Sequence, residues 1–174
     1  MKRLLNALVL TAVSAACLCA QNGITPYTYI ATTGNVVLAG ATTAATLQQP
    51  AANAQYVSFP SNNTGGVSQN GATVYCSVAC TATVIRNASA ATTTAGTVNS
   101  INPTEPPAVV NFFTSSNYSG GTTLEVFNIA ATTTLSIDLG GFYLLPSGTT
   151  SNITIAINSI TGTANITFYL IERH

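Results

Sequence analysis

The stretch NITIAINSITGTANITFYLI, residues Asn152 to Ile171, alternates apolar and polar residues in both of its halves. A period of two places the apolar side chains on one face, which is the pattern of a half-buried β-strand. Thr161-Gly162 lies between the halves and is a candidate hairpin turn. We therefore expect an antiparallel hairpin with one buried face. The side chains expected on that face are Ile153, Ile155, Ile157, Ile166, Phe168 and Leu170.

Shorter alternating runs, separated by turn residues, lie upstream of this hairpin. The clearest is 135–139, in which three aliphatic residues share one face. Within 122–129 the alternation predicts that Leu124 and Val126 face the core and that Glu125 faces solvent. Further strand candidates are 36–38, 56–59, 73–76, 81–86 and 108–113. Runs of this length and composition are typical of antiparallel sheets rather than helices.

The fold class that follows is all-β. We expect an antiparallel β-sandwich, jelly-roll-like, with about eight to ten strands. In general style the alternating strands that end at Glu172 resemble the jelly-roll modules of capsid and trimeric surface proteins, without a specific motif. No run beyond the first twenty residues has a convincing helical period.

The first twenty residues, 1–20, have the pattern of a secretory signal peptide. Lys2 and Arg3 form a short positive region, and Leu4–Val13 is an apolar stretch too short to cross a bilayer comfortably. We expect this segment to be cleaved, which gives a secreted or cell-surface protein with no membrane span after processing.

Two cleavage positions fit the small residues at the end of this segment, one after Ala16 and one after Ala20. A lipoprotein acylated at Cys17 is a less favoured alternative, because Ser14 stands where an aliphatic residue is normally expected. An uncleaved anchor is the third alternative. Beyond the leader we expect an extended N-terminal arm over 21–35 and a single β-sandwich domain over 36–174, the size of one ordinary domain.

Charge is nearly absent from the expected mature chain. Its six formal charges are Arg86, Arg173, Glu105, Glu125, Asp138 and Glu172, and it contains no lysine. Nucleic-acid binding and attraction to anionic membranes both need clustered basic residues, so neither is expected. Little electrostatic repulsion keeps copies of such a chain apart, which favours self-association.

Two cysteines, Cys76 and Cys80, follow the leader and form an isolated pair. In an oxidising compartment an isolated pair predicts a disulfide. Residues four apart in a continuous strand are roughly 13 Å apart, whereas a disulfide requires Cα atoms within about 7 Å. The chain must therefore turn between the two cysteines if they are bonded. A redox pair, a metal site and intermolecular bridges are the less favoured alternatives.

The expected mature chain has few side chains that are suited to catalysis. The only histidine is the terminal His174, so neither a Ser–His nor a Cys–His pair has a credible base. Glu125 and Asp138 lie on strands expected to be adjacent and could form a glycosidase-like carboxylate pair. Each is at an outward position, however, and the chain has no tryptophan to stack a sugar. We expect no enzyme activity, no metal site and no cofactor.

The composition instead favours a secreted, non-catalytic structural or surface-interaction protein. It would self-assemble through low-charge Thr/Ala-rich β faces into a homo-oligomer, with a trimer as one option. The Thr/Ala-rich stretches are 39–46, 88–97 and 130–134. The alternative is a lectin-like carbohydrate-binding module that contacts surface glycans. Its candidate sugar-stacking residues are Tyr27, Tyr29, Tyr56, Tyr118 and Tyr143.

Asn-x-Ser/Thr triplets are a separate feature of the sequence. They begin at Asn62, Asn87, Asn117, Asn152 and Asn165. Such triplets are acceptors for N-glycans in some compartments. A chain this rich in Asn, Ser and Thr produces several by composition alone, so the sequence leaves their modification open.

Overall fold

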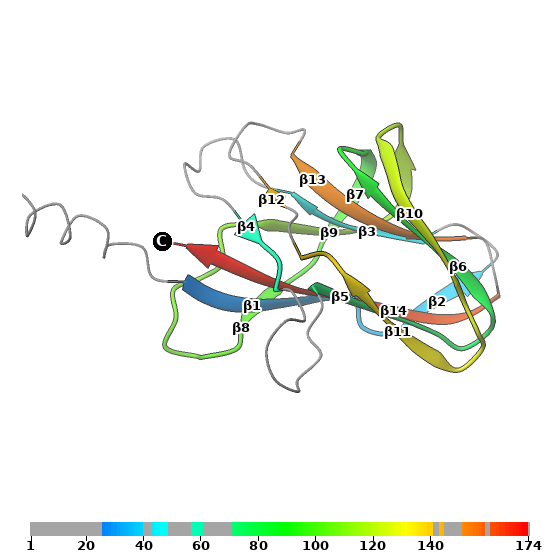
Figure 1. Ribbon diagram of the computed structural model, residues 1–174, viewed down its shortest axis with the longest axis horizontal. Coiled ribbons are helices and arrows are strands. Elements are labelled where there is room, and N and C mark those ends of the chain that lie inside the picture. Colours follow the sequence, from blue (N-terminus) through cyan, green and yellow to red (C-terminus); the bar gives the residue numbers. More distant parts are fainter. Residues whose placement is uncertain are drawn as a thin grey trace, which may run out of the picture.

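The chain folds into two antiparallel β-sheets that face each other in a sandwich-like arrangement (Figure 1). This computed structural model describes residues 26–39, 43–48, 57–60, 71–140, 143–144, 151–158 and 161–173. Within these ranges all regular structure is β-strand, which confirms the all-β prediction. No helix in the described ranges is long and apolar enough to span a membrane.

One sheet, sheet A, has eight strands with the central order β11-β5-β14-β1-β8. Strands β2 and β4 also pair with the long strand β14, and β12 pairs with β4. The strands of sheet A are β1 (Pro26–Thr32), β2 (Val36–Ala39), β4 (Val57–Ser58), β5 (Gly71–Cys76), β8 (Val98–Ser100), β11 (Thr133–Asp138), β12 (Tyr143–Leu144) and β14 (Thr161–Arg173).

The other sheet, sheet B, has six strands in the order β10-β6-β13-β3-β9-β7. Its strands are β3 (Thr43–Gln48), β6 (Cys80–Arg86), β7 (Ser89–Ala95), β9 (Asn111–Ser119), β10 (Thr122–Ile129) and β13 (Asn152–Ile157). The fourteen strands of the described ranges exceed the eight to ten expected, because strands such as β3 and β7 lie in Ala/Thr-rich stretches where large apolar residues do not alternate with polar ones.

The inner faces of the two sheets form one hydrophobic core. The largest fully buried side chains are Tyr29, Phe168, Leu47, Ile137, Leu139, Ile153, Ile155, Ile157, Ile166 and Leu170. Phe112 from sheet B and Phe168 from sheet A meet edge to face, with ring centroids 6.3 Å apart. Aromatic pairs favour this arrangement, which joins the two layers near the middle of β14.

The terminal hairpin expected over 152–171 is wrong in its pairing. Strand β13 pairs with β3 and β6 in sheet B, whereas β14 pairs with strands of sheet A. The two strands therefore face each other across the core instead of sharing hydrogen bonds. All six side chains expected to be buried are buried, because strands that pack face to face bury the same alternate residues as a hairpin with one covered face.

The predicted orientation of β10 is also wrong. Its register against β6 shifts between Thr123 and Glu125, so Leu124 occupies a bulge. A bulge inserts one residue and reverses the alternation beyond it. Val126 is consequently 55% exposed, whereas Phe127 packs against the core and Ile129 is buried.

The extended N-terminal arm expected over 21–35 is not an arm where the structure describes it. Residues Pro26–Thr32 form β1, which pairs with β14 on one side and with β8 on the other. Alternate residues of β1, including Tyr29 and Ala31, are buried in the core. Residues 21–25, like the predicted leader, lie outside the described ranges.

Cys76 and Cys80 stand at disulfide-bonding distance, with sulfur atoms 2.06 Å apart and Cα atoms 6.3 Å apart. Cys76 ends β5 in sheet A, and Cys80 begins β6 in sheet B. The chain turns between them, as the spacing required. The pair therefore fastens a point at which the backbone passes from one sheet to the other.

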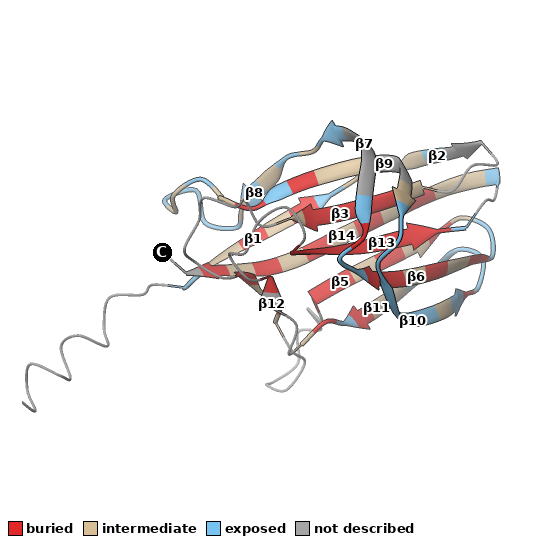
Figure 2. Ribbon diagram, turned by 90° about the horizontal axis from the view of Figure 1, so that it is seen from above, coloured by how far each residue is buried: buried red, intermediate tan, exposed pale blue. Residues whose placement is uncertain are grey.

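The outer face of sheet B is partly covered by the chain's own strands. Part of β7 and β9 runs across the direction of β3 and β13 (Figure 2). A second cluster of buried residues on this face consists of Ala44, Ile85, Ala88 and Ala156, with Tyr118 of β9 packed against it. Small side chains in β3 and β13 allow this close approach.

Replacing Phe168 by alanine should destabilise the protein strongly, by about 3–5 kcal/mol, because it leaves a cavity at the contact between the sheets. Chemical denaturation of the variant and the parent measures this loss. Val126→Ala, at an exposed position, is the matched control and should stay within about 0.5 kcal/mol of the parent. A similar small loss for Phe168→Ala would contradict the observed packing.

Candidate functional site

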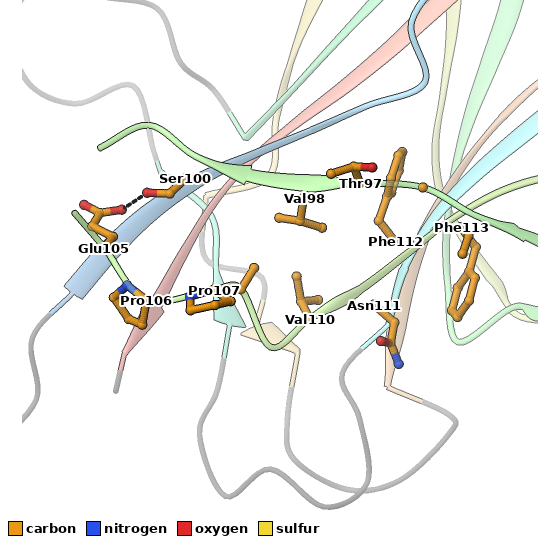
Figure 3. A pocket seen from close by; sticks show the side chains of 13 residues that line it. Thr97, Val98, Ser100, Glu105, Pro106, Pro107, Val110, Asn111, Phe112 and Phe113 are labelled. Carbon is orange, nitrogen blue, oxygen red and sulfur yellow. Dashed lines mark hydrogen bonds between the residues drawn. The ribbon is translucent and has the colours of Figure 1, made fainter. Parts of the chain in front are cut away.

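Two surface depressions are candidates for a functional site. The larger, here called the end cleft, has a volume of about 420 Å³ and is lined by residues of two segments, 95–100 and 105–113. Figure 3 shows these segments running beside each other, with Val98 and Val110 pointing toward one another. The smaller depression lies on the outer face of sheet A.

The end cleft forms beyond the end of the β7–β9 pairing, where the chain after β7 leaves β9 and enters sheet A. The Gly96 N–H donates to the Phe112 carbonyl over 2.9 Å, and beyond this point the two segments separate. Strand β8 then joins β1 in sheet A, whereas β9 joins β3 in sheet B. A Cβ atom at residue 96 would overlap the Phe112 ring, so glycine is required for this close approach.

A buried carboxylate fixes one wall of the cleft. Glu172 is 1% exposed and accepts hydrogen bonds from the backbone N–H groups of Val109 and Val110, over 2.9 and 2.8 Å. The Tyr29 hydroxyl donates to the Pro106 carbonyl over 2.9 Å. Residues of β14 and β1 therefore hold the segment 106–110 in place.

The same neighbourhood changes the acidity of Tyr29. Burial of the ring disfavours the phenolate, and the negative charges of Glu172 and Glu105 add to this effect. Together they raise the pKa of Tyr29 to about 12. The hydroxyl consequently stays protonated, as its donation to Pro106 requires.

The chemistry that the end cleft offers is limited. Glu105 is the one ionisable side chain among the described residues that line it, and its carboxylate accepts a hydrogen bond from the Ser100 hydroxyl. Most other lining side chains are aliphatic, aromatic or proline. A single carboxylate without a second acid, a histidine or a lysine offers no acid–base pair in the cleft.

The smaller depression, here called the polar hollow, has a volume of about 230 Å³. It is lined by Asn35, Thr73, Tyr75, Thr134, Asn165 and Thr167. Strand pairing explains this set, because Tyr75 of β5 lies between Asn165 of β14 and Thr134 of β11. All six side chains are polar, and none carries a charge at neutral pH.

Hydroxyl groups form a row beside the polar hollow. Register places Thr32, Thr167, Thr73 and Ser136 opposite one another on four neighbouring strands. The Thr167 hydroxyl donates to that of Thr32 over 3.0 Å. The Thr32 hydroxyl donates in turn to Asn165 Oδ1 over 3.1 Å. Thr167 Oγ1 also lies 3.0 Å from Asn165 Oδ1, so its single proton can point to Asn165 instead of to Thr32.

Of the five tyrosines predicted to stack on sugars, the three whose side chains the structure describes do not gather on one rim. Tyr29 is fully buried in the core, and Tyr27 packs against the same core. Tyr118 packs against the second cluster, on the outer face of sheet B. Tyr56 lies outside the described residues. The backbone of Tyr143 pairs with Ser58, but its side chain lies outside the description.

Glu125 and Asp138 are not on neighbouring strands, contrary to expectation. Glu125 pairs with Val84 in sheet B, and Asp138 pairs with Gly71 in sheet A. The Asp138 carboxylate accepts the backbone N–H of Gly140 over 2.8 Å, which is a local turn contact. Within the described ranges, no three His, Cys, Asp or Glu residues cluster in a way that could hold a metal ion.

Sequence reasoning missed Tyr75 and Asn165 as a possible binding pair. The signal was available, because both occupy the polar positions of alternating strands and therefore face away from the core. What the sequence lacked was the pairing that places β5 beside β14. Among the Asn-x-Ser/Thr triplets, Asn152 is buried and donates to the Ala88 carbonyl, so it is inaccessible in the folded protein.

Comparison of the chain with protein-family models, with curated proteins and with solved structures gave no match.

Removing the carboxylate of Glu172 should destabilise the fold by about 3–5 kcal/mol, because two backbone donors would lose a charged acceptor in a buried position. Denaturation of Glu172→Ala measures this loss. Hydrogen exchange at the Val109 and Val110 amides should accelerate in the same variant. Glu125→Ala, which removes an exposed acid, should change neither quantity appreciably. Unchanged exchange in Glu172→Ala would show that the carboxylate does not hold this segment.

Ionisation of Tyr29 should destabilise the fold at high pH. The pKa of this group rises from 10 to about 12 on folding, so the folded state keeps a proton that the unfolded state loses. The resulting stabilisation is complete below pH 10 and is lost as the pH rises from 10 to about 12. Unfolding free energies of Tyr29→Phe should depend less steeply on pH in that interval than those of the parent. Equal slopes would contradict the assignment.

Proposed function

We propose that this chain is an exported, non-catalytic structural or surface-interaction protein that associates with copies of itself through the outer face of sheet A. The observation that carries the proposal is the chemistry of this face. Around the polar hollow and the hydroxyl row it consists of threonine, serine, asparagine and tyrosine. Asp138 lies on the same face at the end of β11, but the described residues that line the hollow and form the row carry no charge. An uncharged surface of this kind can approach an identical one with little electrostatic cost.

The coverage of sheet B supports the choice of sheet A as the contact surface. The Thr/Ala-rich strand β3 lies in the middle of sheet B, and Ala44, Ala45 and Thr46 are buried there. The Thr46 and Thr154 hydroxyls share a buried hydrogen bond of 2.8 Å. These residues are buried by contacts within the chain, so they are not available to bind a second copy.

The finer features of the proposal come from the sequence. They are a jelly-roll-like sandwich, a signal peptide over 1–20 and a location outside the cell or at its surface. The pairing distance of Cys76 and Cys80 agrees with an oxidising compartment, where disulfides persist.

A lectin-like module is the second candidate function, and the polar hollow favours it. Asparagine and threonine groups beside an aromatic ring are the kind of surface that binds sugar hydroxyls and ring faces. The glycan would then bind at the polar hollow on the outer face of sheet A.

Self-association should be measurable at tens of micromolar by sedimentation of the folded, exported protein. Thr73→Lys places a charge within the outer face of sheet A and should shift the equilibrium toward the monomer, because like charges would oppose each other across the contact. Thr123→Lys adds the same charge on the exposed strand β10 and should leave the equilibrium unchanged. A parent protein that sediments as a monomer would overturn the assembly proposal.

A further inference from the structure

We propose that the polar hollow is a binding site for one ring of a neutral sugar, with Asn165 and Tyr75 as its principal contacts. The inference rests on the second candidate function, a lectin-like module, and it names a ligand class for one place on the outer face of sheet A. It is independent of whether the face also meets a second copy.

Asn165 is held ready for a ligand by its neighbours. Its Oδ1 atom accepts a hydrogen bond from the Thr32 hydroxyl over 3.1 Å and lies 3.0 Å from the Thr167 hydroxyl, which orients the amide. The Nδ2 group is then the donor that this side chain can offer, on a residue that lines the hollow. A fixed donor loses little side-chain entropy on binding.

Tyr75 provides the complementary apolar surface. It lies directly opposite Asn165 in the β5–β14 pairing, and its backbone position places it on the outer face. An aromatic ring with a hydroxyl at its edge can contact the C–H face of a sugar while its hydroxyl bonds to a sugar oxygen. Thr73 and Thr134 flank the ring and add further hydroxyl groups.

The size and charge of the hollow narrow the ligand class. Its volume of about 230 Å³ lies below that of typical drug-sized pockets, which suits a single ring. None of the lining side chains that the structure describes is charged, so none of them compensates the charge of a sialic or uronic acid. A neutral hexose or N-acetylhexosamine unit of a longer glycan fits these constraints.

The test uses the exported protein, produced without N-glycosylation so that Asn165 stays unmodified. Galactose, glucose, mannose and N-acetylglucosamine are titrated into the isotopically labelled protein, and glucuronic acid serves as the charged comparison. With at least one neutral sugar, the Asn165 side-chain amide and the Thr73 and Tyr75 backbone amides should shift. A single ring makes few contacts, so a dissociation constant of about a millimolar is expected.

The decisive variants are Tyr75→Ala and Asn165→Asp. The latter keeps the side-chain size and replaces the amide donor with an acceptor. Each should weaken binding at least about tenfold, since a good hydrogen bond or ring contact is worth that much. The matched controls are Tyr169→Ala and Asn99→Ala, which change residues of sheet A outside the hollow and should bind as the parent does. Folding of all four is checked by their amide spectra.

Three results would overturn the proposal. They are the absence of shifts with every neutral sugar, equal binding by the two decisive variants, and stronger binding of glucuronic acid than of the neutral sugars. Sedimentation of the same samples separates the two proposals. If the protein is a monomer and binds a neutral sugar, the self-association proposal is refuted and the sugar site stands. If the protein self-associates and binds none of the sugars, the sugar site is refuted and self-association stands.

Discussion

Consecutive strands of this chain repeatedly belong to opposite sheets, and the rest of the structure depends on the core contact that this creates. In three pairs of consecutive strands, one strand belongs to sheet A and the other to sheet B. These pairs are β5 and β6, β10 and β11, and β13 and β14. Such neighbours share no hydrogen-bond ladder, so the burial of their inner faces must hold them together. The sulfur pair Cys76–Cys80 fastens the crossing between β5 and β6, and the edge-to-face rings of Phe112 and Phe168 join β9 of sheet B to β14 of sheet A.

The same constraint explains why a carboxylate is buried in a chain with so few charges. Where β8 and β9 part, the segment between them leaves the ladders of both sheets, and its backbone donors need acceptors. Glu172, at the end of the long strand β14, supplies them to Val109 and Val110. A charged acceptor makes stronger hydrogen bonds than a neutral one, which helps to offset the cost of burying the charge. Burial raises the pKa of Tyr29, and the nearby charge of Glu172 adds to this effect.

Alternation in the sequence was sufficient for the fold class and for much of the core, because it reports which side of a strand is covered. It could not report which strand lies alongside, and for that reason the hairpin expected over 152–171 proved to be two strands from facing sheets. One inserted residue, Leu124, was enough to reverse the predicted faces of β10. The candidate site was the feature that the sequence predicted least well, because Tyr75 and Asn165 become neighbours only through the pairing of β5 with β14. Tyr29 stood near predicted loops in the sequence but fills the core.

The two sheets use similar residues for opposite purposes. In sheet B, small Ala and Thr side chains on β3 and β13 let part of β7 and β9 lie across the outer face, and the hydroxyls of Thr46 and Thr154 satisfy each other there. In sheet A, the hydroxyl row beside Asn165 leaves amide and phenol groups at a hollow on the surface. A buried hydroxyl pair is complete in itself, whereas a surface hollow with unused donors gains from a partner that carries its own hydroxyls or amides. The difference in covering, more than the difference in composition, directs any interaction to the outer face of sheet A.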